Sequence, residues 1–107
     1  MEKFKTTHLS ELDLELNFNE VQGERLTIEG IECFMFYDPE ETDQGIIEGY
    51  NISHLETGMR ICNGFTKEDA IKNAKNILIT HKDKVQKVIE TGRQRIKDLG
   101  GIIPVNQ

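Results

Sequence analysis

The sequence predicts an α+β fold, with an antiparallel sheet of about four or five strands over roughly residues 12–62 and a long C-terminal amphipathic helix over roughly residues 66–99. Two observations predict it. In the first stretch, apolar and polar residues alternate with a period of two in short runs separated by turn residues. In the second, apolar residues recur at helical spacing along one stripe. A chain of 107 residues leaves room for one domain, 1–107, with one hydrophobic core.

The N-terminal stretch contains the first expected strand. Residues 1–7 are mostly polar, and we expect them to form a frayed start. In residues 11–18, Asp13, Glu15 and Asn17 alternate with apolar side chains, which indicates a strand with one buried face. The inward side chains of this strand are Leu12, Leu14, Leu16 and Phe18. A short helix capped by Ser10 is the alternative for the same residues.

The next two strands form a hairpin. Gly23 ends the first pattern, and residues 24–28 (ERLTI) form a short strand. Glu29 and Gly30 make a tight turn, because glycine accepts a positive φ. Residues 31–37 (IECFMFY) are apolar on both faces, so this strand is central and covered twice. The long helix covers one face, while the N-terminal segment, the tail or a second protein molecule covers the other.

A loop and a second hairpin lead into the helix. Residues 38–45 (DPEETDQG) have the charges, proline and glycine of a solvated loop. Residues 50–62 form the second hairpin, with its turn at residues 56–58. The helix begins after Thr66, which with Asp69 three residues later approximates a capping box.

The helix is longer than one small sheet can cover. Its 34 residues would extend about 50 Å, whereas a domain of this size has a radius of gyration of about 13 Å. The helix therefore either kinks near residues 80–82, where Thr80 with Asp83 is a candidate second cap, or extends to contact another chain. The tail, residues 100–107, adds a short apolar strip that can dock on an edge. We expect a homodimer joined through the far half of the helix, at Val85, Val88, Ile89, Ile96 and Leu99, or through the uncovered apolar face of the sheet.

The net charge of −6 conceals an uneven distribution. Residues 1–60 contain 14 acidic and 4 basic side chains, a balance of −10, whereas residues 61–107 contain 5 acidic and 9 basic, a balance of +4. Such asymmetry indicates two binding faces, an internal match between sheet and helix charges, or head-to-tail association.

The acidic half favours a non-enzymatic binding protein. Carboxylates along the sheet and its loop resemble the charge pattern of a nucleic-acid backbone, so we expect the chain to engage and inhibit a basic, nucleic-acid-binding protein. Small acidic inhibitors encoded by phages and mobile elements work in this general manner, although no motif carries the comparison. Ordinary solubility is the alternative explanation for these charges. The expected partner-binding residues are Asp38, Glu40, Glu41, Asp43 and Glu48.

Two other functions remain open. A nucleic-acid-binding accessory protein would use cations of the helix as phosphate contacts, although the helix has no aromatic residue for base stacking. The cations closest to one line are Lys75, Lys82, Arg93 and Lys97. A sensor of small molecules or nucleotides would instead use a pocket between sheet and helix near Tyr37, Tyr50 and His54.

Cofactor and covalent chemistry are not indicated. Cys33 and Cys62 lie in apolar strands without metal-ligand spacing, so we expect two buried thiols, no metal and no cofactor. A nucleophilic pair of Cys62 with His54 lacks a third orienting group, and we expect no enzymatic activity. The sequence has no apolar run of membrane-spanning length and no signal-peptide pattern, so we expect a cytoplasmic protein that does not bind membranes.

Overall fold

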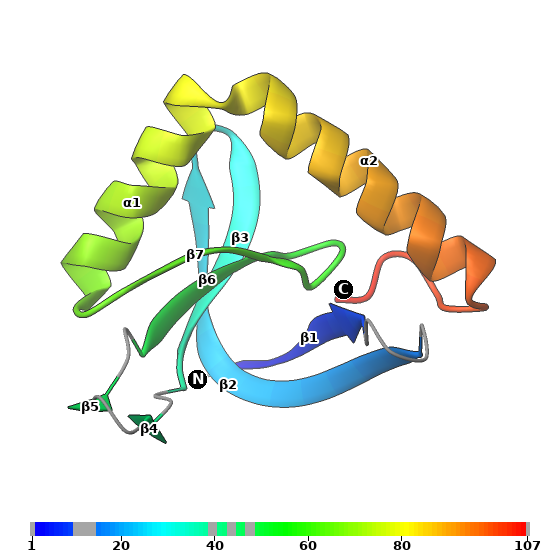
Figure 1. Cartoon of the computed structure of the whole chain (residues 1–107), viewed down its shortest axis with the longest axis horizontal. Coiled ribbons are helices and arrows are strands. Elements are labelled where there is room, and N and C mark those ends of the chain that lie inside the picture. Colours follow the sequence, from blue (N-terminus) through cyan, green and yellow to red (C-terminus); the bar gives the residue numbers. More distant parts are fainter. Residues whose placement is uncertain (1, 10–14, 39–40, 43–44, 47–48, 107) are drawn as a thin grey trace.

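A computed structural model describes residues 2–9, 15–38, 41–42, 45–46 and 49–106 (Figure 1). Its main sheet contains, in spatial order, β1 (Glu2–Leu9), β2 (Leu16–Ile28), β3 (Ile31–Tyr37), β6 (Tyr50–His54) and β7 (Arg60–Gly64), each antiparallel to its neighbours. A small hairpin of β4 (Glu41–Thr42) and β5 (Gly45–Ile46) is inserted between β3 and β6. Two helices follow, α1 (Lys67–Thr80) and α2 (Lys82–Asp98). The α+β arrangement predicted from the sequence is confirmed.

Strand β3 is the centre of the sheet, and both of its faces are covered, as predicted. Cys33 and Met35 pack on the side of helix α1, whose buried alanines allow close approach. Phe34 and Phe36 pack on the opposite side against Phe4 of β1. The buried residues of the helix-side core are Ile28, Cys33, Met35, Ile52, Cys62, Ala70, Ala74 and Leu78.

The second cover comes from the N-terminal strand. The rings of Phe4 and Phe34 stack with centroids 4.7 Å apart and planes 12° apart. Strands two positions apart in a flat sheet lie about 10 Å from each other, so this contact requires the sheet to curl strongly toward that side. Figure 1 shows the curl in the bend of β2. The expected frayed start over residues 1–7 is therefore wrong from Glu2 onward.

Strand β2 also differs from the expectation. It runs through Gly23 instead of ending there, and a Cβ on that residue would lie 2.3 Å from the carbonyl oxygen of Met35 on β3. Glycine at this position thus permits the backbones of β2 and β3 to approach closely. Phe18, predicted to face inward, is exposed. The predicted strand positions at residues 12 and 14, and the alternative cap at residue 10, lie outside the described residues.

The tail docks on β1 through the side-chain amide of Asn106, whereas Ile102 of the predicted apolar strip is exposed. The Asn106 side chain accepts from the Lys5 N–H at 2.6 Å and donates to the Lys5 carbonyl at 3.0 Å, as a neighbouring strand would. The same amide donates to the Leu55 carbonyl at 2.8 Å, and the Val105 N–H donates to the Glu56 carbonyl at 2.6 Å. The tail therefore joins the outer edge of β1 to the β6–β7 hairpin.

The turn of that hairpin completes the closure. The Thr7 N–H donates to the Gly58 carbonyl at 3.0 Å, and the Thr7 hydroxyl donates to the Thr57 carbonyl at 2.5 Å. Gly58 has a φ of +73°, and a Cβ there would lie 2.6 Å from the Lys5 carbonyl oxygen. The first and last strands of the sheet are thus brought together at one end.

The helical region breaks where a kink was predicted, at His81. The first cap is confirmed, because the Asp69 N–H donates to the Thr66 hydroxyl at 3.0 Å. The second predicted cap is wrong: the hydroxyl of Thr80 donates to the side chain of Asn76, and His81 caps α2 without a side-chain hydrogen bond. Figure 1 shows the two helices meeting at an elbow above the sheet. Neither helix is long and apolar enough, over the residues described, to cross a membrane.

Because the helix breaks at His81, three of the five residues that were predicted to join two copies pack wholly or partly within the chain. Ile89 and Ile96 are buried within the chain, Ile96 to 1% exposure, and Val85 packs against the helix-side core. Val88 and Leu99 are the two expected interface residues that remain exposed. The proposed interface is therefore wrong for the buried Ile89 and Ile96, because α2 turns back instead of extending past the sheet.

We expect Asn106→Ala to destabilise the fold by about 2–3 kcal/mol, because the part-buried backbone groups of Lys5 and the buried carbonyl of Leu55 lose their partners. Thermal unfolding followed by circular dichroism measures this as a fall in Tm of roughly 10 °C. The control is Ile102→Ala, whose side chain in the same tail is 79% exposed, and which should leave Tm nearly unchanged. Equal Tm values for the two variants would contradict docking of the tail by Asn106.

Gly58→Ala should destabilise the protein more than Gly30→Ala. Both glycines have a positive φ, so both substitutions carry a backbone cost of about 1 kcal/mol. Only the Cβ at position 58 meets another strand, since nothing lies within 4 Å of the Cβ position at Gly30. The steric contact adds about 1–3 kcal/mol, which urea unfolding of the two variants would separate. Equal midpoints of urea unfolding for the two variants would show that a Cβ at position 58 does not clash with β1.

Candidate functional site

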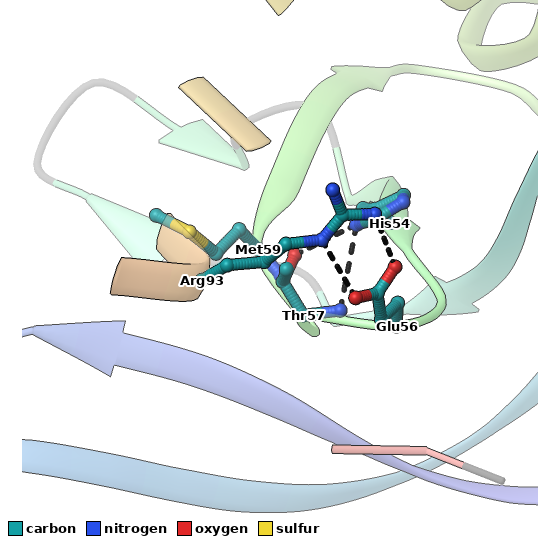
Figure 2. A network of polar contacts seen from close by, with 5 residues as sticks. All are labelled: His54, Glu56, Thr57, Met59 and Arg93. Atoms are coloured by element: carbon teal, nitrogen blue, oxygen red, sulfur yellow. Dashed lines mark hydrogen bonds and ion pairs between the residues drawn. The ribbon is translucent and has the colours of Figure 1, made fainter. Parts of the chain in front are cut away.

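The turn between β6 and β7 contains a buried polar network (Figure 2). The Thr57 hydroxyl lies 2.9 Å from His54 Nδ1 and accepts from the Met59 N–H at 3.3 Å. The Thr57 N–H also donates to His54 Nδ1, at 3.4 Å. Because Nδ1 faces donors, the ring proton lies on Nε2 and the neutral imidazole is the form that fits this turn.

Burial sets the charge state of His54. Desolvation of the ring lowers its pKa below the usual 6.5, with a raising contribution from Glu56 and a lowering one from Arg93. The imidazole is therefore neutral at pH 7.

An ion pair connects this turn to helix α2. Arg93 donates from Nε to Glu56 Oε1 at 2.6 Å and from Nη2 to Oε2 at 2.5 Å. The guanidinium hydrogen bond holds the pKa of the Glu56 carboxyl below its usual range. Both side chains are partly exposed, so the pair fixes the direction of approach of α2 more than it stabilises the fold.

A close packing contact lies beside the ion pair. Gly92 is buried in the middle of α2, and a Cβ there would lie 2.3 Å from the sulfur of Met59. Glycine is unfavourable inside a helix, so its presence here allows the hairpin to touch the helix backbone.

A pocket of about 320 Å³ lies between the β6–β7 hairpin and the helix elbow, and we call it the elbow pocket. Residues of the hairpin, the elbow and the first turns of α2 line it, and most of their side chains are apolar. They are His54, Thr57, Met59, Arg60, Ile61, Ile77, His81, Lys84, Val85, Val88 and Ile89. Such a pocket can hold a small ligand with an apolar body and a polar end.

The structure places the residues of the predicted small-molecule site in two locations. His54 lines the elbow pocket, between sheet and helix as expected. The rings of Tyr37 and Tyr50 instead pack against each other at a tilt of 50°, with centroids 4.7 Å apart, and do not line this pocket. A pocket therefore lies in the expected layer and includes one of the three expected residues, while binding of a small molecule there stays a prediction.

The predicted acidic face lies mostly beyond the described residues. Of its members, Asp38 is exposed, Glu41 lies in β4 without a described side chain, and residues 40, 43 and 48 are not described. Other acids of the sheet pair with cations of the chain itself: Glu2 with Arg25 at 3.2 Å, Glu20 with Lys3 at 3.6 Å and Glu24 with Lys67 at 3.0 Å. Inhibition of a basic protein partner stays a prediction.

The predicted phosphate contacts are not equivalent. Lys75, Lys82 and Lys97 are exposed on the helices. Arg93 is partly exposed and is held by Glu56 through two hydrogen bonds. Binding of nucleic acid through these four cations stays a prediction.

The cysteines are buried, as expected. Burial, with a contribution from Cys62, raises the pKa of Cys33 to about 12, and Cys62 donates to the Ala70 carbonyl at 3.3 Å. Among the described residues, no group of three or more His, Cys, Asp and Glu side chains is arranged to hold a metal ion.

Sequence reasoning missed the roles of Glu56, Thr57, Met59 and Arg93. The sequence indicates the turn only as a connection and Arg93 only as a candidate phosphate contact. Gly92 was the available signal, because a glycine in the middle of a helix commonly marks a close contact.

Comparisons with models of protein families, with curated proteins and with solved structures found no match to this chain.

We expect the stability of the protein to fall as the pH is lowered through about 6.5, because the unfolded chain takes up a proton on His54 more readily than the folded one. In His54→Gln, Tm should change less between about pH 7.5 and pH 5. The control His81→Gln alters an exposed imidazole at the elbow and should keep the pH dependence of the parent protein. Identical pH profiles for all three proteins would contradict the neutral, buried state of His54.

Proposed function

We propose that the protein is a non-enzymatic binding protein whose elbow pocket takes a small organic anion with an apolar body. One observation carries the proposal: the pocket combines apolar walls with basic side chains from three separate elements. Arg60 comes from β7, His81 from the junction of the helices and Lys84 from α2. This combination suits a ligand that is apolar along its length and negative at one end.

The walls offer apolar surface that the protein leaves uncovered. Val88 is 53% exposed although it lies beside the buried Ile89, and Ile61, Ile77 and Val85 are only partly buried. Covering such surface contributes about 25 cal/mol for each Å² removed from water. A ligand with an alkyl chain or an aromatic ring would gain this energy on entering the pocket.

The polar groups favour an anion over a cation. The side chains of Arg60, His81 and Lys84 are exposed, so they reach a ligand while remaining in contact with water. His54 is neutral, so its Nε2–H offers a hydrogen-bond donor without adding a positive charge. A carboxylate or sulfonate therefore meets donors and positive charge, whereas an ammonium group would be repelled.

Two probes test the proposal: the fluorescent anion 8-anilinonaphthalene-1-sulfonate and octanoate as its competitor. We expect the protein to enhance the fluorescence of the sulfonate and octanoate to displace it. Octanol, which has the same chain without the charge, should compete roughly tenfold less well, and rising salt should reduce the difference.

Val88→Glu should weaken the binding of both anions by tenfold or more, since it places a negative charge on the wall of the pocket. The matched control is Ile79→Glu, which replaces a 66% exposed apolar residue on α1 that does not line the pocket. Equal losses in both variants, or equal competition by octanol and octanoate, would overturn the proposal.

A further inference from the structure

The face of the sheet opposite α1 contains a second pocket, of about 480 Å³, which we call the concave pocket. All five strands of the main sheet contribute to it, and it shares with the elbow pocket only Arg60 at the sheet edge. Its lining includes Thr6, Asn19, Phe36, Asn51, Ser53 and Asn63. Half of its twelve lining residues carry an amide or a hydroxyl, whereas most side chains of the elbow pocket are apolar.

The register of the strands explains how these side chains come together. Phe36, Asn51 and Asn63 are paired across β3, β6 and β7, so their side chains form one row on the same face. Phe34 and Ser53 are paired in the next row of that face. The contact of Phe4 with Phe34 curls the sheet toward this side, and the curl brings Thr6 of β1 and Asn19 of β2 around the same hollow.

Ser53 lies at an irregular point of this surface. The pairing of β6 with β7 shifts register between Ile52 and Ser53, as at a β-bulge. Bulges re-aim side chains and are over-represented beside functional sites.

The hydroxyl of Ser53 has no hydrogen-bond partner among the described residues, although the residue is 1% exposed and lines the pocket. A buried hydroxyl without a partner is unfavourable, and native proteins retain few of them. A ligand group that hydrogen-bonds to this oxygen would remove the deficit.

The donor set indicates the class of ligand. Amide and hydroxyl side chains both donate and accept, which matches the hydroxyl groups of a carbohydrate. The lining also includes an acid, Asp38, and two basic residues, Arg60 and His8. Because both signs of charge are present, the site has no excess of one sign that would select an ion. Phe36 adds an aromatic surface beside the polar groups.

We propose that the concave pocket is a binding site for a small neutral polyhydroxylated ligand of the monosaccharide or polyol class, with the Ser53 hydroxyl as one of its contacts. This site does not depend on the function proposed for the elbow pocket. The concave pocket lies on the other face of the sheet, and its proposed ligand is neutral and polar rather than anionic with an apolar body.

The test follows amide chemical shifts of the ¹⁵N-labelled full chain during titration with glucose, ribose and inositol. We expect at least one of these probes to bind in the millimolar range and to shift the signals of residues 51, 53 and 63. If none of the three shifts these signals, or if the shifts map to the elbow pocket, the proposal is overturned.

Ser53→Ala separates a ligand contact from a structural role. Removing an unpartnered hydroxyl should leave Tm of the protein without ligand unchanged or higher, yet it should raise the Kd of the probe roughly tenfold. A lower Tm would show that the hydroxyl has a structural partner, and an unchanged Kd would show that the ligand does not contact it. Either result overturns the assignment of Ser53.

The matched pair Asn19→Ala and Asn17→Ala provides the control. Both residues are exposed on β2, but only Asn19 lines the pocket. Asn19→Ala should raise the Kd of the probe several-fold, whereas Asn17→Ala should bind like the parent protein. Equal effects would place the binding outside the concave pocket and contradict the proposal.

Discussion

Strand β3 has apolar side chains on both faces, and each face must be covered for the fold to be stable. Helix α1 covers Cys33 and Met35 by approaching closely over Ala70 and Ala74. On the face opposite α1, the described residues include no second helical layer. The sheet covers this face itself by bringing Phe4 over Phe34. The curl of the sheet, its closure by the β6–β7 turn and the docking of the tail all accompany this contact.

The two covers also create two different hollows. On the helix side, the break at His81 turns α2 back toward the hairpin, and the angle between the helices leaves an apolar pocket with basic residues. On the other side, the curled strands surround a polar pocket beyond the phenylalanine cluster. A flat sheet under one straight helix would have neither of these features. The proposed ligands differ in polarity because the two faces of the same strands carry different side chains.

The uneven charge of the sequence is partly explained by contacts within the chain. Lys67 at the start of α1 pairs with Glu24 of β2, and Arg93 of α2 pairs with Glu56 of the hairpin turn. Of the three explanations that the sequence left open, these contacts support the internal match between sheet and helix charges. The exposed pairs contribute little stability. The bidentate contact of Arg93 with Glu56 is more specific than these pairs, since it selects the face of α2 that meets the hairpin.

The sequence by itself determined the α+β class, the turn at Glu29 and Gly30, the cap at Thr66, the two-sided burial of β3 and the region of the helix break, because each depends on residues close together in the chain. The tertiary structure alone decided which residues cover the far face and line the pockets. Phe4 is the single apolar residue among residues 2–8, and Asn106 acts by pairing with Lys5 at the other end of the chain. Arg93 and Ser53 likewise acquire their roles from strands and turns distant in sequence. Such contacts leave no periodic pattern, since they arise from the curl of the sheet and the angle of the elbow.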